Sequence, residues 1–155
     1  MQELSFSDEV KLARLDGGGL VALESTLISH GLPYPDNVRV ANAAEAAVRA
    51  SGSIPATIAV VDGVTKIGLE AAEVERLATA KSVLKLSRRN LPLALADTVN
   101  TPELGATTVS ATMILAQRAG IKLFATGGIG GVHRDVTRSM DISADLFELA
   151  HTSVA

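Results

Sequence analysis

Short apolar runs alternate with amphipathic, alanine-rich segments along most of this chain. Runs typical of buried strands occupy 20–23, 57–61, 64–67, 82–86 and 121–125, and helix-like segments lie at 38–50, 70–80 and 91–96. Alternation of this kind is typical of an α/β fold, a largely parallel sheet flanked by helices. We therefore predict one α/β domain over residues 1–155.

Capping and turn residues predict where several of these elements begin and end. Ser7 can cap a short helix over 7–15, and either Asp36 or Asn37 can cap the helix at 38–50. The pair Asp62-Gly63 is a hairpin signal between two strand runs.

The second half of the chain gives three further expectations. The polar segment 97–103 is expected to be an exposed loop, and 105–119 a helix with a buried apolar face. A helix is expected over 143–150, and 152–155 has the pattern of a strand that has just begun. The chain end thus resembles a domain interrupted within an element.

Composition excludes several classes of protein. The chain has no cysteine, which excludes disulfides, thiolate metal sites and cysteine nucleophiles. A formal charge of -3 argues against a nucleic-acid binder, and no apolar run reaches the roughly 20 residues of a membrane span. The polar, acidic N-terminus does not fit a secretory signal, so a cytoplasmic location is expected.

The segment 124–146 combines glycines with ionisable side chains and is the strongest candidate for a site. Its glycines, at 127–128 and 130–131, allow backbone N–H groups to converge on an anion, although a flexible turn is the alternative. The spacing is not that of a dinucleotide-binding loop, and no phosphate-loop lysine follows. His133 beside Arg134 could contact an anion or a sugar, although a solvated histidine is the alternative.

Two carboxylates four residues apart follow the glycines. Asp141 and Asp145 share a face with Ser143 between them, an arrangement that suits a hard cation such as Mg²⁺ or Mn²⁺. The compatible alternative is that Ser143 caps a helix with Asp145 in its first turn.

Other segments supply groups that would complement this loop. Glu24 ends a buried strand run, where α/β sheets place ligands, although a solvated edge residue is the alternative. Lys85 lies within an apolar strand run, where a buried cation needs an anion. The hydroxyls and amides of 107–109, expected near a helix start, favour phosphate. Together these groups indicate a small phosphorylated, hydroxylated ligand.

Six segments resemble, in the right order, the pseudouridine-5′-phosphate glycosidase family, which includes the indigoidine-cluster A proteins. They are ALESTLISHGLPYPDN, PATIAVVDG, KLSRRNLP, GATTVSATM, FATGGIGGVHR and DISADL. The resemblance runs from about Leu20 to Ala155. It implies an α/β enzyme that reversibly cleaves the C–C glycosidic bond of pseudouridine 5′-phosphate to uracil and ribose 5-phosphate. It further implies a divalent cation, typically Mn²⁺, and a homotrimer.

Site residues carry over by motif. The resemblance implies that Glu24 is the proton donor and Asp141 the metal ligand. It implies that the substrate is contacted by Lys85, Val109, Ser143, Ala144 and Asp145. Thr126 and His133 also match active-site positions of the family, with less defined roles.

The family also uses a lysine that the present sequence does not contain. That lysine attacks the anomeric carbon and forms an imine-type adduct, an electron sink for a carbon leaving group. It lies in an A-G-A-K-S type motif just after the position of Ala155, in proteins much longer than this one. Lys11, Lys66, Lys81 and Lys122 lie outside matching motifs. We therefore expect the N-terminal portion of such an enzyme, or alternatively a non-catalytic phosphosugar-binding or assembly module.

Overall fold

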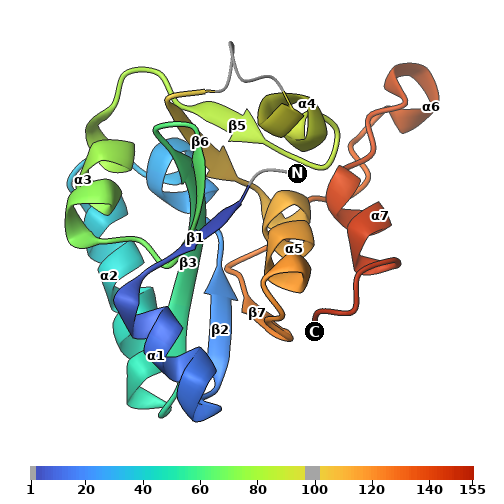
Figure 1. Ribbon diagram of the computed structural model, residues 1–155. Helices are drawn as coiled ribbons and strands as arrows, with labels where there is room; N and C mark the ends of the chain where they lie inside the picture. The colour runs from blue at the N-terminus through green and yellow to red at the C-terminus, as the bar shows by residue number, and fades with distance from the viewer. Residues whose placement is uncertain (1–2, 97–101) are drawn as a thin grey trace.

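A seven-stranded sheet with helices on both faces forms the protein in the computed structural model, which describes residues 3–96 and 102–155 (Figure 1). The strands are β1 (Leu4–Phe6), β2 (Leu20–Leu23), β3 (Ile54–Val61), β4 (Val64–Ile67), β5 (Leu84–Leu86), β6 (Leu104–Thr107) and β7 (Leu123–Ala125). The helices are α1 (Asp8–Asp16), the π-helix η1 (Leu27–Gly31), α2 (Asp36–Ala50), α3 (Ala71–Thr79), α4 (Leu91–Ala96), α5 (Val109–Arg118), α6 (Val136–Ser139) and α7 (Ala144–Leu149).

The sheet is mostly parallel, which confirms the predicted fold class. The pairs β1–β4, β2–β3, β2–β7 and β5–β6 are parallel, whereas β3 pairs antiparallel with β4 and β6. Among the described residues, no helix is long and apolar enough to cross a membrane.

Strand β3 is long enough to pair with two shorter strands, one after the other along its length. Its first half pairs with β2, up to Thr57, and its second half pairs with β6, from Ala59. Because β2 is parallel and β6 antiparallel to β3, the two run toward each other and meet near Ile58. There the Ser25 and Thr107 hydroxyls both donate to the Ile58 carbonyl, at 2.7 and 2.6 Å. The carboxyl ends of β2, β7, β5 and β6 therefore converge on one junction.

Alternating side chains of the sheet build a core on each face. Ala22, Ile58 and Val60 are fully buried in the larger core together with residues of α5. Ala59 and Val61 point to the opposite face and pack with residues of α2, α3 and η1. Burial of both faces is what a mostly parallel sheet requires.

Local signals placed some helix ends correctly. The Ser7 hydroxyl accepts from the Val10 N–H at the start of α1, as predicted. The prediction that Asp36 or Asn37 caps α2 is wrong, since Pro35 occupies the cap position and no side chain caps this helix. Asn37 is buried and instead donates to the carbonyls of Ile28 and Ala78, which ties α2 to η1 and α3.

The helix predicted over 105–119 is wrong at its beginning. Residues 104–107 form β6, and the helix starts only at Val109. Gly105 explains the strand, because a Cβ there would lie 2.5 Å from the Leu86 Cδ1 atom and 3.3 Å from the Val60 Cβ atom. The glycine thus permits β6 to lie between β5 and β3, an arrangement that only tertiary packing reveals.

Two further differences concern the ends of the described chain. Strand β1, which pairs with β4, was not predicted. Residues 152–155 carry no assigned strand, yet Ala155 makes two backbone bonds to β7: its N–H donates to the Lys122 carbonyl and its carbonyl accepts from Phe124. Ala155 thus pairs as a residue of a parallel strand would, but the strand predicted over 152–155 is not observed. Of the loop predicted at 97–103, residues 97–101 lie outside the described residues.

Candidate active site

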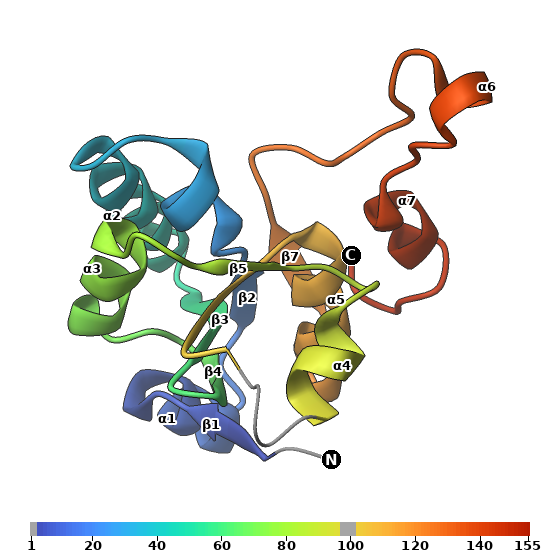
Figure 2. The ribbon, with the colours of Figure 1, turned by 90° about the horizontal axis from the view of Figure 1, so that it is seen from above.

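A cavity of about 380 Å³ lies where the four strand ends converge. The segment after β7 runs out to α6 and returns to α7, which brings it beside the starts of α4 and α5 (Figure 2). Nearly all the residues predicted for the site line this cavity, namely Glu24, Lys85, Val109, His133, Asp141, Ser143, Ala144 and Asp145. Thr126 is outside this lining but donates a hydrogen bond to Glu24.

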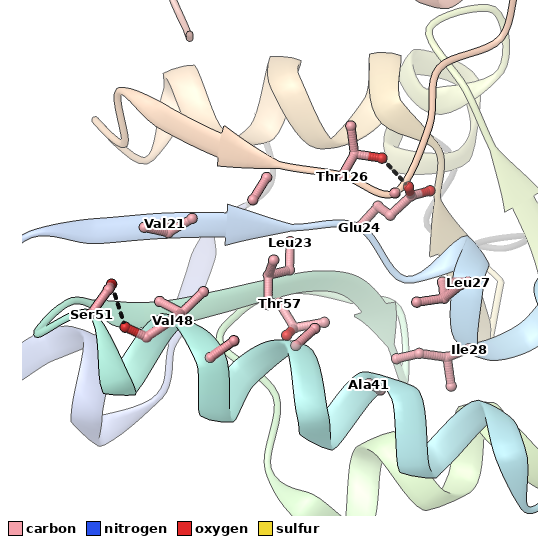
Figure 3. Close-up of a pocket in the computed structure, with 14 residues that line it drawn as sticks. Val21, Leu23, Glu24, Leu27, Ile28, Ala41, Val48, Ser51, Thr57 and Thr126 are labelled. Atoms are coloured by element: carbon pink, nitrogen blue, oxygen red, sulfur yellow. Dashed lines mark hydrogen bonds between the residues drawn. The ribbon is translucent and has the colours of Figure 1, made fainter.

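The Glu24 carboxylate is held by two threonine hydroxyls. Thr126 donates to Glu24 Oε1 at 2.5 Å (Figure 3), and Thr26 donates to Oε2. The Thr126 hydroxyl also lies 2.9 Å from the Gly128 carbonyl and accepts from the Gly128 N–H. Glu24 is half-buried, so its carboxyl group is oriented while one side still reaches the cavity. Thr26 was not predicted; its position two residues after Glu24 was the available signal.

Asp145 is a buried carboxylate whose oxygens both accept from backbone N–H groups. Ser110 at the start of α5 donates to Oδ1 and Gly130 donates to Oδ2, each at 2.9 Å. Ser143 caps α7 by accepting from the Asp145 N–H, so the predicted cap is confirmed. Asp141 and Asp145 both line the cavity, but Asp145 is buried and bonded to two backbone N–H groups, whereas Asp141 is exposed. The cation that they were predicted to share stays a prediction.

The glycine-rich segment is therefore organised around an internal anion. The Gly130 N–H points to Asp145, and a Cβ at Gly130 would lie 2.7 Å from the Ser143 Cβ atom. Glycine is required here for close approach rather than for a positive φ. The Gly130 N–H is therefore engaged within the protein.

Cationic side chains supply one side of the cavity. Lys85 and Arg89 both line it, and the Arg89 guanidinium donates to the Ile142 carbonyl at 2.7 Å. Lys85 is exposed on edge strand β5, so the expectation of a buried cation is wrong. Burial and, second, the charge of Lys85 hold the pKa of His30 below its ordinary value of 6.5.

Fewer polar groups at the start of α5 are available to bind a ligand than the sequence predicted. The Thr107 hydroxyl is buried against the Ile58 carbonyl, and the Ser110 N–H is bonded to Asp145. Thr108 and Val109 line the cavity at the N-terminal end of the helix, where the helix dipole favours an anion.

Asp141 and His133 face each other at the mouth of the cavity. The His133 Nδ1 atom lies 3.4 Å from Asp141 Oδ2, and both side chains are exposed. In the described part of the chain, no group of three or more histidine, aspartate or glutamate side chains could hold a metal ion. A cation here would take one carboxylate oxygen, with His133 beside it, and complete its shell from water or ligand.

An ion pair that sequence did not predict anchors α7. The buried Glu148 accepts from the Arg88 guanidinium at 2.5 Å and from the Thr152 hydroxyl. Arg88 also lies 4.3 Å over the Phe147 ring. Since α7 carries Ser143 and Asp145 at its start, this pair fixes them relative to the β5–α4 turn.

Taken together, the fold and cavity define a class: an α/β protein whose strand ends gather a carboxylic acid, cationic side chains and the start of a helix around one cavity. Comparisons with known proteins agree. The family described as "Indigoidine synthase A like protein" matches residues 9–155. The chain therefore belongs to the indigoidine synthase A-like family.

Individual relatives are named more specifically. Pseudouridine-5′-phosphate glycosidase 1 of Rhizobium johnstonii is 57% identical over 97% of this chain, and a pseudouridine-5′-phosphate glycosidase of Rhodospirillum centenum is 60% identical over 98%. The chain covers 46% of each of these two proteins, so it spans about half of their length.

Solved structures show the same fold. The prealnumycin C-glycosynthase AlnA, in complex with ribulose 5-phosphate, matches with a TM-score of 0.85 and 41% identity, over 99% of this chain and 48% of AlnA. An indigoidine synthase A-like protein from Thermotoga maritima matches with a TM-score of 0.80 and 31% identity, over 96% of this chain and 46% of its own.

Proposed function

We propose that this chain supplies the acid-bearing, phosphosugar-binding half of a pseudouridine-5′-phosphate glycosidase, which releases uracil and ribose 5-phosphate. The observation that carries the proposal is that Glu24, Lys85 and the 143–145 segment line one cavity although they lie far apart in sequence. The names of the relatives and the ribulose 5-phosphate bound to AlnA support it.

The described residues suit distinct parts of such a substrate. Lys85, Arg89 and the start of α5 would bind the phosphate, since two cations and a helix dipole favour a dianion. Glu24, oriented by its two threonines, would deliver a proton to the departing uracil carbon.

Cleavage of a C–C bond needs an electron sink, which the family provides with a lysine. Its amine would bond to the sugar C1 while the ring oxygen leaves with a proton. The bond from C1 to uracil C5 then breaks, its electrons and a proton from Glu24 go to C5, and C1 becomes an imine. Water finally releases ribose 5-phosphate and restores the amine.

The pairing of Ala155 with β7 indicates where such a lysine would lie. Ala155 stands level with Leu123, so a chain continuing as a parallel strand would reach the level of Thr126 about three residues later. Thr126 contacts Glu24, so residues just beyond Ala155 would approach the proton donor.

We also propose that Mn²⁺ binds at Asp141, with His133 beside it. A carboxylate oxygen is a ligand that manganese prefers, and bound water and phosphate would complete its shell. The ion would supply positive charge next to the phosphosugar. A homotrimer, as the family resemblance implies, is proposed for the full-length protein.

Turnover of pseudouridine 5′-phosphate with Mn²⁺ tests the assignment. We expect none from the 155-residue chain and measurable uracil release from a version extended through the A-G-A-K-S type motif. Turnover by the short chain would refute the covalent step, and an inactive extended protein that still binds ribose 5-phosphate would refute the glycosidase assignment.

A second candidate, a non-catalytic phosphosugar-binding module, is favoured by one observation: Lys85 and Arg89 line the cavity together within this chain. Calorimetry with ribose 5-phosphate should then detect binding that Lys85→Ala abolishes. Lys81→Ala, an exposed lysine outside the cavity, is the matched control and should leave binding unchanged.

A further inference from the structure

A second cavity, of about 440 Å³, lies between α2 and the sheet face formed by β2 and β7 (Figure 3). Its walls are mostly apolar and come from β2, β3, β7, η1 and α2. We call it the apolar groove, defined by Val21, Leu23, Ala44, Ala47, Val48 and Ala125. Glu24 and Thr126 lie at one end of it, so the apolar groove and the candidate active site share the proton donor.

The groove exists because no described element covers this face of β7. Helix α2 packs against β3, η1 and α3, which leaves β7 beyond its reach. Phe124 packs into the core on the α5 face, so its neighbours Leu123 and Ala125 point to the groove side. Both are exposed, Leu123 by 50%. Strands of parallel sheets are normally covered on both faces.

The groove has the surface that a packed helix requires. Small side chains recur at helical spacing along α2, at Ala41, Ala44 and Ala47. Because these side chains are short, the backbone of another helix could approach α2 closely. The lining also includes two hydroxyls, of Ser51 and of the buried Thr57, and the Thr57 hydroxyl donates to Glu45. An amphipathic helix would bury its apolar side here and leave its polar side in water.

The pairing at β7 and the length of the relatives indicate where that helix comes from. Ala155 already pairs with the edge of β7 next to the groove, so further chain would begin beside it. The matched region covers only 46–50% of the relatives' length, so each of them has further polypeptide to place.

We propose that the apolar groove seats an amphipathic helix from the polypeptide that relatives carry beyond the matched half. The helix would cover β7 and exclude water from one side of Glu24. The proposal does not depend on the reaction assigned above, because it concerns only which surface is buried.

Absence of cysteine allows a direct test. Ala47→Cys places a thiol in the groove, and Ala43→Cys places one on α2 outside it; both positions are exposed. Each variant would be labelled with a maleimide, alone and with a cysteine-free polypeptide that comprises the part of the Rhizobium johnstonii relative following the matched region. Complex formation is measured by size-exclusion chromatography with light scattering.

We expect a complex in which labelling at position 47 slows about tenfold or more, since a covered thiol reacts only through local opening, while position 43 stays unchanged. A complex that leaves position 47 reactive would overturn the proposal, as would the absence of a complex. Protection of position 47 in the chain alone that grows with chain concentration would also overturn it, because a second copy would then occupy the groove.

Discussion

Replacing Asp145 with asparagine tests whether this carboxylate is primarily structural. Asp145 is 8% exposed and accepts from the Ser110 and Gly130 N–H groups, so it joins α5 to the glycine-rich segment. An asparagine side chain keeps one acceptor oxygen but turns an NH₂ group toward the other amide, and it removes the negative charge at the α5 N-terminus. Loss of one charge-assisted hydrogen bond costs about 1.5–3 kcal/mol, and loss of the dipole interaction about 0.3–1 kcal/mol.

The free energy of unfolding should therefore fall by roughly 2–4 kcal/mol, the sum of the two losses. In a domain of this size that lowers the melting temperature by about 4–16 °C, at roughly 2–4 °C per kcal/mol. Urea unfolding followed by far-ultraviolet circular dichroism measures it, and the slope m should stay constant. Asp141→Asn is the control, since Asp141 is exposed, and should change stability by less than about 0.5 kcal/mol. An Asp145→Asn variant as stable as that control would refute the structural role.

Two further predictions concern the same cavity. Gly130→Ala should lower stability and abolish ribose 5-phosphate binding in calorimetry, because its Cβ would press on Ser143; Gly127→Ala, with open space around it, should do neither. Binding of ribose 5-phosphate at Lys85 should raise the pKa of His30 toward 6.5 in an NMR titration, since the anion offsets the Lys85 charge. Without ligand, the pKa of His30 in the folded protein lies below 6.5. The neutral form of His30 therefore contributes stability above pH 6.5, and this contribution is lost as the pH falls through the folded-state pKa. An unchanged titration on binding would contradict the placement of the phosphate.

The fold class and much of the site follow from local sequence signals. Alternating apolar and amphipathic runs predicted the mostly parallel sheet, and Ser7 and Ser143 marked the starts of α1 and α7. Glu24 and Lys85 were predicted to contribute to one site, and the cavity brings them together. These features could be predicted because each depends on a local pattern or on the residue type at one position of a strand or helix.

What sequence could not predict depends on contacts between distant segments. The 104–107 strand has a glycine and an alanine at its centre and little strand propensity, so only the space beside Leu86 and Val60 explains it. The meeting of β2 and β6 along β3 likewise has no local signature. Arg88 and Glu148 are 60 residues apart, and their ion pair could not be inferred from either segment alone.

Glu24 and Asp145 both accept two hydrogen bonds, yet the donors give them different chemistry. Backbone N–H groups cannot rotate, so the donors to Asp145 fix its carboxylate between α5 and the glycine-rich segment. The donors to Glu24 are hydroxyls, which rotate. When Glu24 carries a proton, Thr126 can donate to the Gly128 carbonyl, 2.9 Å away, and accept from Glu24 instead. The side chain of Glu24 can therefore keep a hydrogen-bonding partner both as acceptor and as donor, which is what the proton transfer proposed for it requires.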